Sequence, residues 1–494
     1  MRISGMHALA ALGLPLLLAA AGGPALAQPV APGPGAAAPP GAPEARQAVP
    51  GGQSDQVEPY GGPVWQRSAL LGDPGGARSR LAARGVTFGL LEQAEVLGNP
   101  TGGTRQGAVF EGLLTVSAGL DTGKAGLWPG GTFNASAYQI HGRGLSLNNL
   151  GNNGNTVSSL EAVRGTLLFE LWYEQALLDK RLSIRAGQLA ADQEFMVSTY
   201  AALFLNHTFG WSTLPSADLP SGGPAYPLAT PGVRVRVTPR EDLALLAGVF
   251  NGDPAGPGRG LPQERDPSGT AFRTGDGVFA IAEAQYSLNG GEGATGLPGT
   301  YKLGAYYDSQ PFADQRRNSA GASLADPANQ AGSALATGRT RRNDHGLYGT
   351  ADQLVWRKEG TKDGGVGVFV RLMGAPGDRN LVNFYADAGV TWKGVVPGRD
   401  SDTAGIGVGV ARTSDTAAQL DKDVRTLTGN PAYPIRRHET VLELTYQAQI
   451  APWWQVQPTF QYLFNLNGGV PNPRDPGKRL GDAAVLGVRT GVTF

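Results

Sequence analysis

The 494-residue chain contains no cysteine, so it can form neither disulfides nor thiolate metal sites. It also lacks an excess of charge: 41 Lys and Arg residues balance 41 Asp and Glu residues. A nucleic-acid partner is therefore not expected, because such proteins usually carry a basic surplus. No His, Asp or Glu residues cluster at the spacing of metal ligands, so no metal or other cofactor is predicted. The 74 glycines and 36 prolines work against long helices.

Long apolar runs are missing except at the amino terminus. Residues 8–21 (ALAALGLPLLLAAA) follow a positively charged start and precede the small-residue tripeptide Ala25-Leu26-Ala27. That order is typical of a secretory signal peptide, which we place at residues 1–27. The alternative, a membrane-anchoring helix, needs about 20 apolar residues. No later stretch reaches the length of a membrane-spanning helix.

The next segments are interpreted from composition. Residues 28–63 are rich in Pro, Ala and Gly and bury too little apolar surface to offset the entropy of ordering, which predicts a linker. Residues 64–85 are expected to form a short periplasmic segment in which ARSRLAAR makes one or two helical turns. Residues 86–494 are predicted to form one large β-domain.

From Val86 onward, apolar and polar residues alternate with a period of two, which predicts strands. In ETVLELTYQAQI (439–450), the apolar residues from Leu442 to Ile450 share one face, while Glu443 and Gln447 share the other. The sixteen candidate strands lie at about 86–97, 112–121, 131–141, 164–175, 182–188, 232–238, 243–250, 278–288, 301–308, 346–357, 365–373, 383–393, 404–412, 439–450, 455–464 and 484–494.

The connections between these strands alternate in length. Those after odd-numbered strands are mostly long, and those after even-numbered strands are mostly short. A soluble β-sandwich has no reason for this asymmetry, whereas a transmembrane barrel has short periplasmic turns and long extracellular loops. We therefore predict an all-β fold: a transmembrane antiparallel β-barrel of about 16 strands. Its sheet must close, because lipid offers no partners for backbone groups.

Outward-facing positions are almost free of charge, as they must be when a Lys or Arg at mid-membrane costs about 2–4 kcal/mol. Glu92 is the exception, and two explanations are open: a bulge at Gly89, or a position outside the lipid zone. The chain ends on Phe494, which we expect at the periplasmic interface, where the last strand closes against the first. Trp453 and Trp454 suit the interfacial aromatic girdle.

Inward-facing positions are polar and of mixed sign, and barrels of 16–18 strands enclose an aqueous channel. A hydrogen bond exchanged between water and the wall nets only about 0.5–1.5 kcal/mol, which suits a solute that must also leave. The alternative is that these groups pair with one another and brace the barrel. The predicted channel-lining residues are Glu170, Glu174, Arg185, Arg234, Arg236, Glu283, Arg371, Asp387, Glu443, Gln447 and Gln461.

The longest connection, about 189–231, is too apolar to be only a solvated outer loop. We expect it to fold into the barrel and narrow the pore, with its aromatic residues available to stack on sugar rings. A lid packed on the outer rim is the alternative. The aromatic residues in question are Phe195, Tyr200, Phe204, Phe209 and Trp211.

Several stretches together resemble a known family, the carbohydrate-selective porins called OprB. They are LGDPGGARSRLAARGVTF, LFELWYEQALLDKRLSIRAGQL, LFLNHTFGW, the region from YGTADQLVWR to GVFVRLMGAPGDRN, and ETVLELTYQAQIAPWWQVQPTFQYLFN. The resemblance runs from about residue 70 to the end. It implies a sixteen-stranded outer-membrane channel for passive uptake of glucose and related sugars, narrowed by inward loops. On that basis Glu170, Arg185, Arg234 and Glu443 are the preferred lining residues.

Other functions remain as alternatives. A porin of different or general selectivity is the nearest, although equal numbers of inward Arg and acidic residues favour a neutral solute. A barrel hydrolase would need a nucleophile beside a base, and the His residues beyond the signal peptide lie in or beside predicted loops, so an enzyme is not expected. A structural or adhesive barrel is a further alternative. The expected partners are small sugars and outer-membrane lipid, with both a monomer and a homo-oligomer such as a trimer left open.

Overall fold

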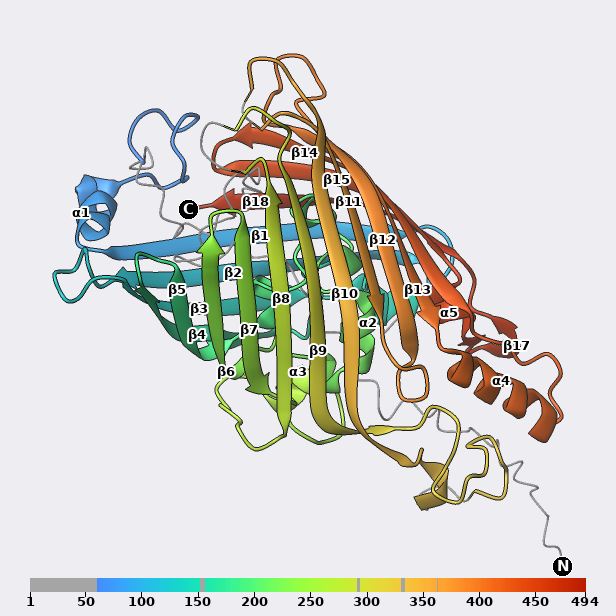
Figure 1. Ribbon diagram of the computed structural model, residues 1–494. Coiled ribbons are helices and arrows are strands. Elements are labelled where there is room, and N and C mark those ends of the chain that lie inside the picture. The colour runs from blue at the N-terminus through green and yellow to red at the C-terminus, as the bar shows by residue number, and fades with distance from the viewer. Residues whose placement is uncertain (1–59, 152–155, 291–293, 330–333, 362) are drawn as a thin grey trace, which may run out of the picture.

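A computed structural model describes residues 60–151, 156–290, 294–329, 334–361 and 363–494. The predicted signal peptide and all but the last four residues of the predicted linker lie outside these described residues. Within them, sixteen antiparallel strands form a closed barrel, as the sequence predicts (Figure 1). Strands that follow one another along the chain are neighbours, and β18 lies between β15 and β1 to close the barrel.

Each of the sixteen predicted strands is present. The barrel strands are β1 (Val86–Asn99), β2 (Gly107–Asp121), β3 (Gly131–Gly142), β4 (Gly165–Leu177), β5 (Leu182–Leu189), β6 (Thr230–Arg240), β7 (Leu243–Asn251), β8 (Val278–Leu288), β9 (Gly299–Ala313), β10 (Thr340–Arg357), β11 (Gly365–Gly374), β12 (Val382–Lys393), β13 (Thr403–Thr413), β14 (His438–Ala451), β15 (Trp454–Phe464) and β18 (Ala483–Thr493). A small separate hairpin, β16 (Pro471–Asn472) with β17 (Asp475–Arg479), lies in the loop before β18.

Helices are short and lie in the connections. The α-helices are α1 (Ala77–Ala83), α2 (Thr213–Asp218), α3 (Pro262–Arg265), α4 (Asp415–Leu427) and α5 (Leu466–Gly469). The other helical turns are η1 (Pro74–Gly76), η2 (Ser146–Leu150), η3 (Ala191–Gln193), η4 (Ala201–Leu203), η5 (His207–Phe209), η6 (Pro220–Gly222) and η7 (Ala334–Ala336). Among the described residues, no helix has both the length and the apolar character needed to cross a membrane.

The longest helix, α4, lies in the β13–β14 loop. A cap at its amino terminus and an ion pair farther along the helix hold it in place. Ser414 caps its amino terminus by accepting a hydrogen bond from the Ala417 N–H at 3.2 Å. Arg316, in the β9–β10 loop, pairs with Asp423 on the helix at 2.7 Å. This hydrogen-bonded contact lowers the pKa of Asp423 below its ordinary value. Two long loops are thereby joined at one end of the barrel.

The carboxyl terminus closes the barrel against the first strand. The Phe494 N–H donates to the Leu90 carbonyl at 2.9 Å, and Arg78 of α1 donates to the Phe494 carbonyl at 2.7 Å. Figure 1 shows α1 near the carboxyl-terminal end of the chain. Trp453 stacks on Trp454 with ring centroids 5.9 Å apart. The final strand therefore runs to the end of the chain because its last residues complete the seam with β1.

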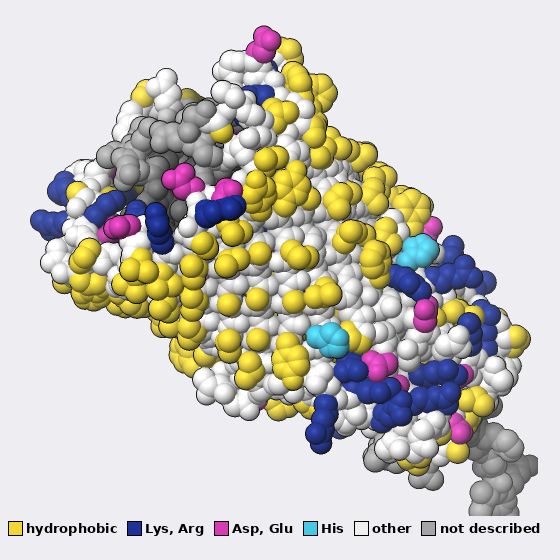
Figure 2. All heavy atoms as spheres, in the orientation of Figure 1, with side chains coloured by type: hydrophobic (Ala, Val, Ile, Leu, Met, Phe, Trp, Pro, Cys, Tyr) yellow, Lys and Arg dark blue, Asp and Glu magenta, His cyan; other side chains and the backbone are white. Residues whose placement is uncertain are grey.

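The two faces of the barrel differ as lipid and water require. Exposed apolar side chains cover the outside, and polar or charged ones fill much of the inside. On β8, for example, Glu283 and Gln285 are buried and point inward, while Val278 and Tyr286 are exposed. Figure 2 shows apolar side chains spread over the middle of the visible outer face, with few charged groups among them.

Glu92 points outward without any bulge, which excludes the first of the two explanations, a bulge at Gly89. The pairing of β1 with β2 and with β18 is continuous through Glu92. Phe88 and Val96, four residues to either side on the same face, are 51% and 52% exposed. Glu92 therefore lies within the apolar band, which removes the second explanation as well.

A partner on β3 makes this position tolerable. The His141 Nε2 lies 3.3 Å from the Glu92 Oε1, and its Nδ1 lies 3.0 Å from the Gln139 Oε1. The imidazole crosses β2 at Gly112, where an added Cβ would lie 2.3 Å from the His141 Nε2. The lipid-facing carboxylate is thus compensated by a neighbour two strands away, and Gly112 leaves the space for it.

We expect His141→Leu to destabilise the barrel by about 1–3 kcal/mol, because it leaves the Glu92 carboxylate unpaired beside acyl chains. The free energy of unfolding in lipid vesicles measures this effect. The matched control is the double variant Glu92→Leu/His141→Leu, which removes both polar groups and should be close to the parent protein. If the single and double variants lose the same free energy of unfolding, the contact with His141 does not compensate the Glu92 carboxylate.

Candidate functional site: the barrel lumen

The β5–β6 loop, residues 190–229, folds into the barrel, where green segments are visible behind the strands in Figure 1. Three inward carboxylates hold it: Glu283 on β8, Asp352 on β10 and Glu443 on β14. They accept backbone N–H groups at 2.8–3.0 Å, from Met196 to Glu283, from Thr199 to Asp352, and from Leu205 and Asn206 to Glu443. Because these carboxylates lie on different parts of the wall, the loop spans the lumen and is not a lid on the outer rim.

A buried ion pair fixes the part of the loop around residues 208–210. Arg371 on β11 and Asp387 on β12 pair across neighbouring strands, and both side chains are completely buried. Arg371 also donates to the Gly210 carbonyl at 2.6 Å and to the Thr208 carbonyl at 2.8 Å. The Tyr385 hydroxyl donates to Asp387 at 2.8 Å. Two residues predicted to line the channel therefore serve here as attachment points for the loop.

The aromatic residues of the loop pack against the wall and each other. Phe204 and Phe209 have ring centroids 4.6 Å apart, and both pack near Phe369 of β11. Phe195 meets Phe250 of β7 edge to face at 6.5 Å. These rings are almost fully buried, so they do not offer the free faces expected for stacking on sugars. They explain why the loop is apolar: its rings attach it to the wall.

Trp211 and Tyr200 complete that set. Trp211 is buried and donates its indole N–H to the Gly222 carbonyl at 2.9 Å. Tyr200 is only partly buried and lies against Gly367, where an added Cβ would be 2.1 Å from its ring. Tyr200 is therefore the one aromatic residue of the predicted set with ring surface not fully enclosed.

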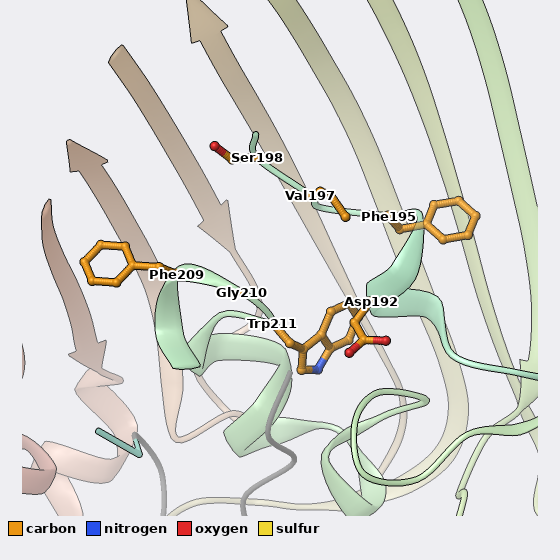
Figure 3. Close-up of a pocket in the computed structure, with 7 residues that line it drawn as sticks. All are labelled: Asp192, Phe195, Val197, Ser198, Phe209, Gly210 and Trp211. Carbon is orange, nitrogen blue, oxygen red and sulfur yellow. The ribbon is translucent and has the colours of Figure 1, made fainter. Parts of the chain in front are cut away.

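A small pocket separates two arms of the loop, residues 192–198 and 209–211 (Figure 3). Its volume is about 10 Å³, about enough for one water molecule. In Figure 3, Phe195 and Phe209 point away from each other toward opposite sides, whereas Asp192 and Trp211 lie close together. The pocket is far too small to be a sugar site.

Four charged side chains form a compact cluster, which we call the Arg–Glu square. Arg185 of β5 contacts Glu174 and Glu194, each at 2.8 Å. Arg234 of β6 contacts the same two carboxylates at 2.6 and 2.7 Å. Strand register explains three of the corners, because Glu174 is paired with Arg185 and Arg185 with Arg234. The loop supplies the fourth corner, Glu194.

The wall beside the square adds an aromatic surface and another cation. The Arg185 guanidinium lies 3.9 Å from the ring centroid of Trp172 on β4, a cation–π contact. Arg236, two residues beyond Arg234 and on the same face of β6, is partly exposed. It makes no hydrogen bond or ion pair with another residue in the described part of the chain. Glu170, which accepts the Trp172 indole N–H at 3.2 Å, belongs to the same wall, so the region has three guanidinium groups and three carboxylates.

The remaining predicted lining residues are inward-facing but differ in exposure. Glu170 is buried and accepts the Ala190 N–H at 3.2 Å. Gln461 is buried and accepts from the Asn206 side chain at 3.0 Å. Gln447 is partly exposed and donates to Gln457 at 3.2 Å. Among the predicted lining residues, Arg236 and Gln447 thus keep the most exposed surface.

Sequence reasoning did not single out Glu194, Asp352 or Trp172. Asp352 and Trp172 lie on inward positions of predicted strands, so strand parity was available as a signal for both. Glu194 lies in an irregular loop and has no such signal. The β3–β4 loop also contributes, because Ser158 and Ser159 each accept from Arg489 of β18 at 3.2 Å.

The His residues offer no catalytic arrangement in the described structure. His141, His345 and His438 lie on barrel strands and face outward, and His207 is buried in the β5–β6 loop. The His207 Nδ1 is 2.8 Å from the Thr156 backbone nitrogen. Among the described residues, no group of three or more His, Asp or Glu side chains is placed to hold a metal ion.

A closed barrel with an apolar exterior, a charged interior and an inward loop defines the porin class of outer-membrane channels. Residues 105–494 match the family described as "Carbohydrate-selective porin, OprB family". The chain therefore belongs to the OprB family of carbohydrate-selective porins. Family and fold place it in the outer membrane and indicate a channel rather than an enzyme.

Individual relatives agree with this assignment. The chain is 25% identical over 440 residues to "Porin B" of Pseudomonas aeruginosa, covering 86% of this chain and 91% of that protein. It is 23% identical over 463 residues to "Putative porin QuiX" of Acinetobacter baylyi, covering 87% and 93%. Its fold is similar to that in the high pH structure of Pseudomonas putida OprB, with a TM-score of 0.75 and 22% identity over 87% of this chain and 99% of that one.

Proposed function

We propose that this protein lets small sugars, glucose and related carbohydrates, diffuse passively across the outer membrane into the periplasm. The observation that carries the proposal is a lumen wall of mixed sign, in which the buried guanidinium and carboxylate groups of the Arg–Glu square alternate at 2.6–2.8 Å beside the partly exposed Arg236. Such a wall offers sugar hydroxyls hydrogen bonds through its partly exposed groups, Arg236 and Gln447. Its nearly balanced charge avoids strong attraction of either ion sign.

The weakness of each contact suits passage through the pore. A hydroxyl that exchanges water for a protein group gains only about 0.5–1.5 kcal/mol, so a sugar held by two or three such contacts can still leave. An apolar sugar face could lie on an aromatic side chain such as Tyr200. We assign the first solute contacts to the partly exposed groups, Arg236 and Gln447.

A second candidate is an anionic solute, because the partly exposed Arg236 is a cation that makes no ion pair with another described residue. Sugar acids or phosphate would then be favoured over neutral sugars. The two kinds of solute should affect the ion current differently. An anion should compete with chloride for the channel, whereas a neutral sugar should only obstruct the flow of ions.

Planar-bilayer recordings of the purified protein test this proposal. We expect glucose and maltose to lower the ion current in a saturable way, while phosphate at the same concentration has little effect. Liposome swelling with glucose provides a measure of sugar passage itself, with protein-free liposomes as the control. Block by phosphate without block by sugars would establish the anionic candidate instead, and conductance unaffected by any of these solutes would reject a selective site.

A further inference from the structure

The extracellular ends of β10–β14 carry cations on the outward face, directly beyond the apolar belt. We call Arg342, His345, Arg412 and His438 the rim band; all four are exposed. The connecting regions 314–344, 375–381, 412–438 and 465–482 contain fourteen Lys and Arg residues against nine Asp and Glu residues. Figure 2 shows Lys and Arg side chains gathered at the end of the barrel where α4 lies, beyond the apolar side chains of the middle.

Strand register fixes how these cations adjoin apolar residues. Arg412 of β13 is paired with Phe384 of β12 on one side and His438 of β14 on the other, so the three share the outer face. Val408, four residues from Arg412 on the same face of β13, is exposed. A molecule bound here would meet cations at one end and an apolar surface at the other.

The same arrangement repeats on β10. His345 is paired with Tyr307 of β9, and Leu347 lies two residues nearer the membrane, with both apolar neighbours exposed. Arg342 is paired with Pro311, an outward position of β9, beyond a bulge at Asn343. The register through β11 and β12 places Arg412 level with Leu347 of β10, three strand spacings or about 14 Å away, and His345 and Arg342 lie farther along β10 toward the loops.

These cations have capacity for another anion. The side chain of Arg342 makes no hydrogen bond or ion pair with another residue that the structure describes. Arg412 pairs with Asp415 at 2.8 Å, but Asp415 is 81% exposed, and such surface pairs contribute little. A guanidinium binds phosphate more strongly than a neutral polar group, because its donors match two phosphate oxygens at once.

We propose that the rim band binds the phosphate groups of a phosphorylated glycolipid in the outer leaflet. The acyl chains of this lipid lie along Leu347, Phe384 and Val408 while its phosphates contact Arg342 and Arg412. These two cations are separated by three strand spacings, about 14 Å, and by a further offset along the strands, so the band engages either two phosphates of one headgroup or the headgroups of two adjacent lipids. Lipid is favoured over a free anion because the cations border an outward apolar surface.

Binding of lipid A to the full-length protein in detergent, followed by native mass spectrometry, tests the proposal. The probes are lipid A with two phosphates, the same lipid after removal of its phosphates, and pyrophosphate. We expect the phosphorylated lipid to bind clearly more tightly than the dephosphorylated one. Equal affinity of the two lipids would overturn the proposal without need of any variant, and displacement of lipid A by pyrophosphate at equal concentration would show that the band selects a free anion.

A double variant locates the site. Arg342→Gln/Arg412→Gln should weaken lipid A binding about fivefold, the sum expected of two exposed charge contacts. The control, Lys180→Gln/Arg181→Gln, removes two exposed charges from a turn at the opposite end of the barrel and should bind like the parent protein. Equal affinity in the two double variants would exclude the rim band, and heat-modified migration in gels verifies that both are folded.

Discussion

Replacing Arg371 with Met is expected to free the 206–211 arm of the inward loop and to raise the single-channel conductance. Arg371 holds that arm through the carbonyls of Thr208 and Gly210, and its loss also leaves Asp387 buried without a counter-charge. Removing one partner of a buried ion pair costs about 3–5 kcal/mol. Single-channel recordings and the free energy of unfolding should therefore both change, and block by sugars should weaken.

A double variant separates these two effects. Arg371→Met/Asp387→Leu removes both charges, so most of the stability should return while the loop contacts remain lost. Arg357→Met is the matched control, because Arg357 lies at the turn end of β10, far along the strand from the loop. If the folded Arg371→Met variant conducts and is blocked like the parent protein, the carboxylates of Glu283, Asp352 and Glu443 alone are sufficient to hold the loop.

The sixteen strands could be predicted because lipid and water impose opposite demands on alternate residues. Errors occur at strand ends, where that contrast fades. β2 begins at Gly107, five residues earlier than predicted, because Ala108 and Phe110 continue its outward face beside β1. β10 begins at Thr340, because polar residues such as Arg342 extend the strand past the apolar belt. Pairing with a neighbour, and not hydrophobic alternation, sets these boundaries.

Parity also identified which side chains face inward, but it could not say what they touch. Arg185 and Arg234 were predicted as lining residues, yet Glu194 joins them only because the irregular β5–β6 loop folds back to the wall. In the same way, Glu92 was recognised as an outward acid, but its partner His141 becomes apparent only when the register of β1, β2 and β3 is known. Contacts across the lumen and between strands depend on tertiary structure.

Replacing Glu194 with Gln is expected to shift the channel toward anions. The change leaves three guanidinium groups, Arg185, Arg234 and Arg236, against the two wall carboxylates Glu170 and Glu174. One unit charge at 4 Å is worth about 1 kcal/mol in water, which corresponds to about a fivefold change in relative permeability. The reversal potential in a KCl gradient should accordingly move toward that of chloride, and Glu264→Gln, in the exposed β7–β8 loop, should leave it unchanged.

Comparing Glu194→Gln with Glu174→Gln distinguishes charge from position. Both variants remove one negative charge from the Arg–Glu square, but Glu174 belongs to the wall and Glu194 to the loop. If charge alone governs selectivity, the two reversal potentials shift equally. If the loop must also be held against the wall for sugars to bind, Glu194→Gln additionally weakens sugar block, because its neutral amide holds two guanidinium groups less firmly. An unchanged reversal potential in both would show that ions pass the square without sensing its charge, which would remove it from the conducting path.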